Sequence, residues 1–216
     1  MIDLSLSLVT DSGIATRAGH DLADLVAAAV ANGVTSVQVR EKTLSGRAFL
    51  ETVCRIAEVV PDGVPVIVND RVDVYLAARA AGAAVAGVHV GQSDLPPRLV
   101  RTLIGDDAVL GLTAGTPGQV VRAARDDARI DYVGVGALHA TRTKPDAPPA
   151  LGLAGARTVL AECTLPAVVI GGVTAVDVAG LRAAGAAGVA VVSAICGAPD
   201  PGPAARELRR AWEEAA

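Results

Sequence analysis

Two cations and an amide alternate with valines in the segment VQVREK, residues 37–42. Because successive side chains of a strand point to opposite faces, Gln38, Arg40 and Lys42 share one face and the valines take the other. A row of polar groups directed into a protein interior is costly unless a partner satisfies it. The spacing therefore predicts an anion-binding site at the end of this strand, rather than an ordinary solvated strand end.

Two aspartates follow the next apolar segments: Asp70 ends VIVND, and Asp94 ends GVHVGQSD. Carboxylates at the ends of neighbouring parallel strands can share one Mg²⁺, which takes one or two carboxylates and fills its remaining positions with phosphate and water. We therefore predict that Asp70 and Asp94 bind Mg²⁺. The alternatives are that Asp70 caps a helix or pairs with Arg71, and that Asp94 caps a helix before Pro96. His89 is predicted to be a packed, hydrogen-bonded residue.

Glycine and small residues follow the last two apolar segments, at Gly171-Gly172 and at Val192-Ser193-Ala194. Backbone N–H groups at these positions form the usual phosphate cradle of barrel enzymes, so the pattern predicts a site for a phosphate monoester. A third loop, residues 140–144 (ATRTK), carries hydroxyls and cations, although a flexible surface loop would have the same composition.

Eight short apolar segments alternate with helical patterns at a spacing of roughly 25 residues, which predicts a single-domain (β/α)₈ TIM barrel over residues 1–216. An open doubly wound sheet would usually stop at five or six strands. Ser45, Thr116 and Thr174 are predicted to cap helices. Strands are expected near 4–9, 36–40, 65–68, 86–90, 108–112, 131–135, 167–170 and 188–192, and helices near 22–31, 45–60, 72–81, 96–104, 117–128, 152–161, 175–184 and 203–214.

The composition excludes several classes of partner. The net charge is −4 and aromatic residues make up 2% of the chain, so a stacking surface for nucleic acid is not expected. No apolar run approaches the roughly 18–20 residues that span a bilayer, and the N-terminal residues do not show a basic region followed by a long hydrophobic stretch. Three cysteines without metal-ligand spacing suit a reducing compartment. We expect a cytoplasmic protein that binds no membrane; a homo-oligomer is compatible with the sequence.

Together these segments resemble the thiamine phosphate synthase family over almost the whole chain. The resemblance implies a (β/α)₈ transferase of thiamine biosynthesis with two small-molecule phosphate substrates. Such an enzyme joins 4-amino-2-methyl-5-(diphosphooxymethyl)pyrimidine to 4-methyl-5-(2-phosphoethyl)thiazole, or to its carboxylated form, with Mg²⁺, and releases diphosphate. The matching motifs are QxRxK (38–42), VND (68–70), GVHxGQxD (87–94), YVGxG (132–136), TxTK (141–144), IGG (170–172) and VVSAI (191–195).

The resemblance also implies a role for each matching residue. Ionisation of the pyrimidine methylene before its capture by the thiazole nitrogen needs positive charge near the leaving group and no strong general base. Arg40, Lys42 and Lys144 would supply that charge as the catalytic groups. The pyrimidine diphosphate would contact Gln38, Arg40, Lys42, Asn69, Thr113 and Lys144; the thiazole phosphate would contact Thr141, Thr143, Gly172, Val192 and Ser193; and Mg²⁺ would contact Asp70 and Asp94.

The chain departs from the family pattern at three positions. Thr113 stands where the family commonly has serine, Gly115 where it has histidine, and Ala140 where it has proline. Two other functions stay open. A thiazole tautomerase shares the glycine and small-residue pocket but needs neither the diphosphate cations nor the metal carboxylates, and a catalytically silent phosphate-binding barrel would also keep the fold.

Overall fold

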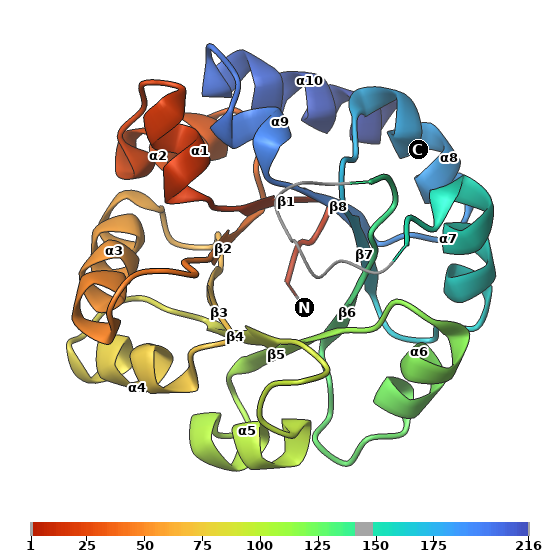
Figure 1. Cartoon of the computed structure of the whole chain (residues 1–216), viewed down its shortest axis with the longest axis horizontal. Coiled ribbons are helices and arrows are strands. Elements are labelled where there is room, and N and C mark those ends of the chain that lie inside the picture. Colours follow the sequence, from red (N-terminus) through yellow and green to blue (C-terminus); the bar gives the residue numbers. More distant parts are fainter. Residues whose placement is uncertain (1, 141–148, 216) are drawn as a thin grey trace.

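The computed structural model describes residues 2–140 and 149–215, in which eight parallel strands close into a barrel in chain order (Figure 1). Every strand pairs with its sequence neighbours, and β1 pairs with β8 to close the ring. This confirms the predicted (β/α)₈ barrel. The strands are β1 (Leu6–Val9), β2 (Ser36–Val39), β3 (Val66–Asn69), β4 (Gly87–Val90), β5 (Val109–Thr113), β6 (Tyr132–Val135), β7 (Ala167–Ile170) and β8 (Gly188–Val191).

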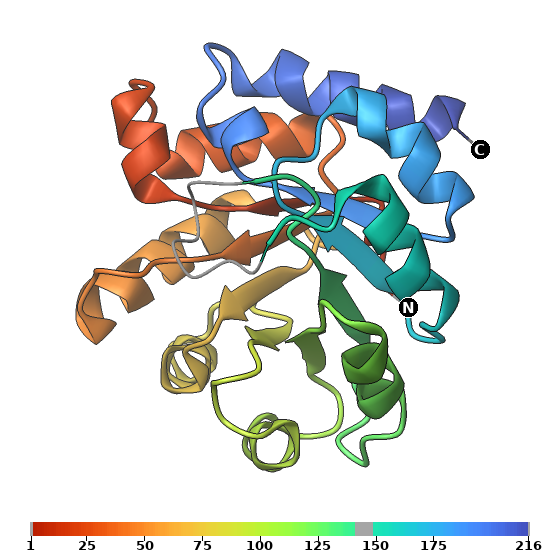
Figure 2. The same ribbon diagram turned by 45° about the vertical axis from the view of Figure 1, so that its right-hand side comes forward.

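The helices form an outer ring around the strands (Figures 1 and 2). All eight predicted helices are present, with ends that differ by a few residues, and two short helices, α1 and α9, were not predicted. Within the described residues, no helix has the length and apolar character needed to cross a membrane. The helices are α1 (Ser12–Arg17), α2 (Leu22–Ala31), α3 (Gly46–Val59), α4 (Val72–Ala80), α5 (Pro97–Ile104), α6 (Pro117–Ala124), α7 (Gly152–Ala161), α8 (Ala175–Ala183), α9 (Ser193–Cys196) and α10 (Pro201–Glu214).

The predicted caps begin the helices as expected. The side chains of Ser45 and Thr116 accept hydrogen bonds from the N–H groups of Ala48 and Gln119, at the starts of α3 and α6. Thr174 begins α8 in a capping box, in which the Asp177 carboxylate accepts the backbone N–H of Thr174 at 2.9 Å. These local bonds satisfy N–H groups that a helix start leaves without an intrahelical partner.

Alternation along the strands separates two layers of side chains. Val37, Val39 and their equivalents face the helices in one large core, while residues of the other set, such as Ile67 and Val168, pack inside the barrel. Leu4, which precedes β1, packs with this inner set at the amino-terminal ends of the strands. Side chains therefore fill the barrel at the amino-terminal ends of the strands, and its free interior space lies toward their carboxyl ends.

Candidate active site

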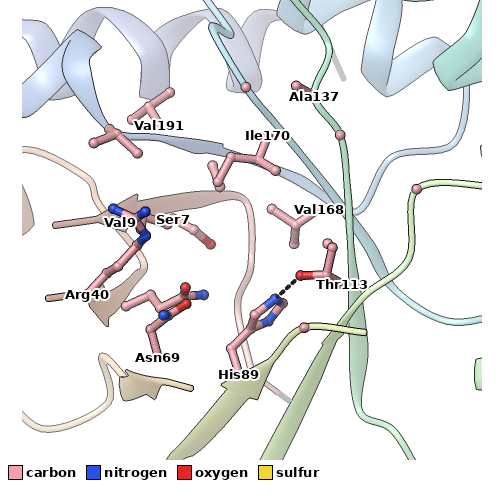
Figure 3. A pocket seen from close by; sticks show the side chains of 18 of the residues that line it. Ser7, Val9, Arg40, Asn69, His89, Thr113, Ala137, Val168, Ile170 and Val191 are labelled. Carbon is pink, nitrogen blue, oxygen red and sulfur yellow. Dashed lines mark hydrogen bonds between the residues drawn. The ribbon is translucent and has the colours of Figure 1, made fainter. Parts of the chain in front are cut away.

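A cavity of about 740 Å³ lies at the carboxyl ends of the strands and is lined by residues from all eight strands or the loops after them. Figure 3 shows Arg40 and Asn69 on one side of it, with Ile170 and Val191 across from them. The cavity brings together Gln38, Arg40, Lys42, Asn69, Asp70, Asp94, Thr113, Gly172, Val192 and Ser193. The other three predicted residues, Thr141, Thr143 and Lys144, lie outside the described residues.

Arg40 is held by the segment that follows β1. Its backbone N–H donates to Thr10 Oγ1 at 3.0 Å, and its Nη1 lies 3.7 Å from Asp11 Oδ2. In the same segment Ser12 Oγ donates to Glu41 Oε2 at 2.8 Å. Burial raises the pKa of Glu41, with the bond from Ser12 opposing that rise. Three consecutive residues thus fix the backbone and side chains at the end of β2.

Lys42 and two carboxylates form a second charged group beside Arg40. Lys42 Nζ lies 2.5 Å from Asp70 Oδ2, and the Gly91 N–H donates to Asp94 Oδ2 at 2.7 Å. Burial alone would raise the pKa of Asp70, but the bond and charge of Lys42 outweigh it, so that this pKa is lowered. Burial and the neighbouring charge of Asp70 raise the pKa of Asp94, while the Gly91 N–H opposes the rise. The two carboxylates therefore lie close enough to interact.

The alternative explanations of these aspartates do not hold in the structure. Arg71, not Asp70, is the N-cap residue of α4, and its guanidinium bonds to Asp73 at 2.8 and 2.6 Å. The cap of α5 is Pro96, and Asp94 bonds to Gly91 instead. Asp70 also adopts a φ of +60°, a left-handed conformation uncommon outside glycine and often found at functional sites.

The donor set fits one Mg²⁺ that is completed by a phosphate ligand. Among the residues the structure describes, no group of three or more His, Cys, Asp or Glu side chains is arranged to hold a metal. Two interacting carboxylates supply only part of an octahedral shell, and Mg²⁺ commonly completes its shell with substrate phosphate and water. Asp70 and Asp94 are therefore suited to bind the ion together with a substrate rather than alone.

On the opposite side, backbone geometry shapes the cavity. Gly171 and Gly172 have φ values of +103° and +68°, which glycine adopts without strain. A Cβ at Gly172 would lie 3.1 Å from the Cβ of His139, so the strand end packs closely on the loop after β6. The His139 N–H donates to the Gly171 carbonyl at 2.8 Å, and its Nε2 lies 2.9 Å from Asp177 Oδ1. Ser193 begins α9 on the same side.

The departure at Gly115 is accommodated by glutamines. The Gly115 N–H donates to Gln119 Oε1 at 2.9 Å, and Gln92 Nε2 donates to the Thr113 carbonyl at 2.6 Å. A Cβ at Gly115 would lie 2.9 Å from the Gly136 carbonyl oxygen, so the backbone here is too close for a side chain without adjustment. Both glutamines line the cavity.

Several cavity residues were not singled out from the sequence. Ser7 and Ser36 are buried side by side, with their Oγ atoms 2.6 Å apart. Their place is implied by alternation, since Ser36 precedes Gln38 by two residues, but nothing marked serine as a site residue. Tyr132 was noted only within a motif. It bonds to His89, which is buried as predicted.

The comparisons with known proteins agree with this geometry. The family described as "Thiamine monophosphate synthase" matches residues 6–195. The thiamine-phosphate synthase of Azorhizobium caulinodans is 44% identical over 96% of this chain and 94% of its own length. That of Xanthobacter autotrophicus is 47% identical over 97% and 95%. A solved structure of thiamine phosphate pyrophosphorylase from Pyrococcus furiosus is 28% identical, with a TM-score of 0.85 over 99% and 97% of the two chains.

A match across nearly the whole barrel, at this level of identity and with the charged groups and glycines gathered in one cavity, confirms the resemblance seen in the sequence: the chain belongs to the thiamine monophosphate synthase family.

Proposed function

We propose that this chain is a thiamine-phosphate synthase that transfers the (4-amino-2-methylpyrimidin-5-yl)methyl group of 4-amino-2-methyl-5-(diphosphooxymethyl)pyrimidine to the nitrogen of 4-methyl-5-(2-phosphoethyl)thiazole. The observation that supports this most is the division of one cavity of about 740 Å³ into two sides. Arg40, Lys42, Asp70 and Asp94 line one side, and the backbone at Gly172 and Ser193 lines the other. One side suits a diphosphate with its metal, and the other suits a phosphate monoester.

The charged side binds the pyrimidine diphosphate. Arg40 and Lys42 face the diphosphate. Lys144, which the sequence motif assigns to the same substrate, adds a third positive charge. Gln38, Asn69 and Thr113 supply amide and hydroxyl groups that orient the pyrimidine and its methylene. Asp70 and Asp94 hold Mg²⁺, which when bound supplies positive charge to the departing diphosphate.

The backbone side binds the thiazole phosphate. N–H groups near Gly172, Val192 and Ser193 contact its phosphate oxygens, and the hydroxyls of Thr141 and Thr143 add further donors. This anchoring places the thiazole nitrogen facing the pyrimidine methylene and makes the capture step effectively intramolecular.

The reaction proceeds by dissociation. The electron pair of the methylene carbon–oxygen bond leaves with diphosphate, where Arg40, Lys42 and Lys144 stabilise the growing negative charge. The pyrimidine amine donates electron density to the resulting cation, and the thiazole nitrogen lone pair forms the new carbon–nitrogen bond. No proton has to be removed from the nucleophile, so no general base is needed.

The direct test is the release of diphosphate by the purified protein. We expect release only when both substrates and Mg²⁺ are present, with thiamine phosphate formed in equal amount. Release without the thiazole would indicate a hydrolase. Turnover of a thiazole isomer with no diphosphate chemistry would identify a tautomerase, and binding without turnover would identify a silent barrel.

Lysine chemistry gives a second, binding-only test. The chain contains two lysines, Lys42 and Lys144, and both belong to the proposed diphosphate site. Reductive ¹³C-methylation keeps their charge and gives each a separate NMR signal. We expect inorganic diphosphate with Mg²⁺ to shift both signals, with Lys42→Arg and Lys144→Arg used for assignment. Signals that do not respond at saturating diphosphate would exclude both lysines from the site.

A further inference from the structure

Three side chains from three strands are hydrogen-bonded in a row across the floor of the cavity. Tyr132 Oη lies 3.0 Å from His89 Nδ1, and His89 Nε2 lies 3.0 Å from Thr113 Oγ1, the bond drawn in Figure 3. Gln38 lines the same cavity on the tyrosine side. Gln38 and Thr113 are in the proposed pyrimidine diphosphate site, and Tyr132 and His89 are the inner members between them.

The two inner members are fixed by packing. Tyr132 is 4% exposed and His89 is 7% exposed, and their ring centroids are 5.4 Å apart. Both rings lie against Gly111, where a Cβ would collide with the His89 ring nitrogen and with the Tyr132 ring. A Cβ at Gly134 would lie 3.2 Å from His89 Cε1. The backbone therefore leaves these rings little freedom, and their buried polar atoms keep the partners they have.

The direction of the hydrogen bonds follows from the tyrosine. Burial strongly raises the pKa of Tyr132, against a smaller opposing effect of the Gln38 side chain, so the phenol keeps its proton. The Tyr132 O–H is then available to donate to His89 Nδ1. A neutral imidazole that accepts at Nδ1 donates from Nε2, here to Thr113 Oγ1.

We propose that Tyr132 and His89 are positioning residues that turn the Thr113 hydroxyl into a hydrogen-bond donor toward the diphosphate of the pyrimidine substrate. Because Thr113 accepts from His89, its own hydrogen is directed toward the cavity that it lines. Ionised phosphate oxygens only accept hydrogen bonds, so a hydroxyl with this orientation matches them. The inference rests on the proposed function, which places Gln38 and Thr113 at this substrate.

The kinetic test compares the two tyrosines of the chain, Tyr132 and Tyr75. Tyr132→Phe keeps the ring and removes the hydroxyl, and we expect kcat/KM for the pyrimidine diphosphate to fall about tenfold, the scale of one misdirected hydrogen bond to a charged group. The apparent KM of the thiazole phosphate should stay within about twofold. Tyr75→Phe removes an equally buried hydroxyl on α4, away from the cavity, and should leave both constants unchanged.

A double-mutant cycle tests whether the effect passes through Thr113. Thr113→Val removes the hydroxyl at nearly constant volume. If Tyr132 acts by orienting that hydroxyl, the double variant should be little slower than Thr113→Val alone. Fully additive losses, or a Tyr132→Phe variant with the kinetic constants of the parent, would overturn the inference.

The tautomer of His89 can be read without activity. The chain has three histidines, and ¹⁵N NMR of the imidazoles, with His89 assigned from its absence in His89→Gln, distinguishes Nε2–H from Nδ1–H. We expect Nε2–H at His89, and the Nδ1–H form would contradict the proposed direction even if a kinetic variant failed to fold. A parent protein that releases no diphosphate would refute the proposed function instead, which keeps the two failures apart.

Discussion

The two sides of the cavity are built by different means. Beside β2, β3 and β4, charged side chains line it: Arg40, Lys42 and Asp70 are held by specific bonds to Thr10, to Asp11 and to one another. Beside β7 and β8 the cavity is lined instead by glycines with positive φ and by the start of a short helix. The first side depends on which charges are present, and the second depends on where the backbone lies.

This difference predicts how each side fails when it is altered. Removing a charge on the first side leaves the fold intact and leaves the leaving group without compensation, so the loss appears in catalysis. Adding atoms on the second side shifts the backbone or blocks the phosphate, so the loss appears in substrate binding and in stability. The predictions below test that separation, beginning with the largest expected effect.

Replacing Asp70 or Asp94 with Ala should lower turnover by about 100-fold or more, the scale of losing a group that stabilises charge in the transition state. The fold should stay intact, because neither side chain caps a helix. Turnover measured against Mg²⁺ concentration should show weaker Mg²⁺ binding, so that the rate saturates only at a higher Mg²⁺ concentration than in the parent. Asp73→Ala is the matched control, because Asp73 lies on α4 outside the cavity and forms its ion pair with Arg71, just before that helix.

Near-normal turnover of both variants at low Mg²⁺ would break the metal assignment. It would also weaken the comparison, because the charged side would then depend on its cations alone.

Lys144→Ala should lower kcat as well as kcat/KM by about tenfold or more, because its charge matters most as negative charge builds on the departing oxygen. Single-turnover measurements at saturating substrates isolate the chemical step from product release. Arg142→Ala removes a cation two residues away and serves as the control. If kcat is unchanged and only KM rises, Lys144 is a docking residue.

The sequence predicted the barrel and the charged side well because both depend on local patterns. Alternation in VQVREK placed Gln38, Arg40 and Lys42 on the cavity face, and they line the cavity. The bonds from Asp11 and Ser12 to residues near 40, and from His139 to Asp177, join positions about 30 to 40 apart. No local pattern encodes such pairs, since they depend on strand register and on the paths of loops.

The short helices show the same limit. α1 and α9 have six and four residues, too few for a repeating apolar pattern to reveal them. Tyr132 was visible in a motif, but its role depends on His89, 43 residues away. Glycines marked the backbone side, although the contact of Gly172 with His139 required the structure.

Gly172→Ala should raise the apparent KM of the thiazole phosphate by about tenfold, a loss of roughly 1.4 kcal/mol, with a much smaller change for the pyrimidine diphosphate. The added methyl group would press on His139 beside the phosphate site. Gly185→Ala carries a similar backbone strain at φ +92° with open space around it, in the turn before β8, and controls for that strain. Equal increases in both KM values would show that the phosphate site is placed wrongly.

The smallest expected effect concerns Asp177, which connects the start of α8 to His139 in the loop after β6. Burial would raise the pKa of Asp177, but its bonds from Thr174 and His139 outweigh burial and lower the pKa below the ordinary value of 3.8. A carboxylate whose pKa is lowered by folding stabilises the protein above its unfolded pKa, and this contribution is lost as the pH falls through the folded value.

Asp177→Asn should therefore lower stability at pH 7 by about 1 kcal/mol, the scale of a helix cap. For a chain of this size that corresponds to a fall in Tm of about 2–4 °C. The difference in stability between parent and variant should narrow as the pH falls below about 5, and it should close once the pH lies below the lowered pKa of Asp177 in the folded protein, where the parent carboxylate is protonated too. Asp107→Asn, at an exposed aspartate before β5, should show no such gap in the same thermal unfolding series. A gap for Asp177→Asn that stays constant down to the lowest pH would mean that shape, and not charge, holds α8 against the loop after β6. The backbone side would then be supported by packing alone, with no contribution from charge.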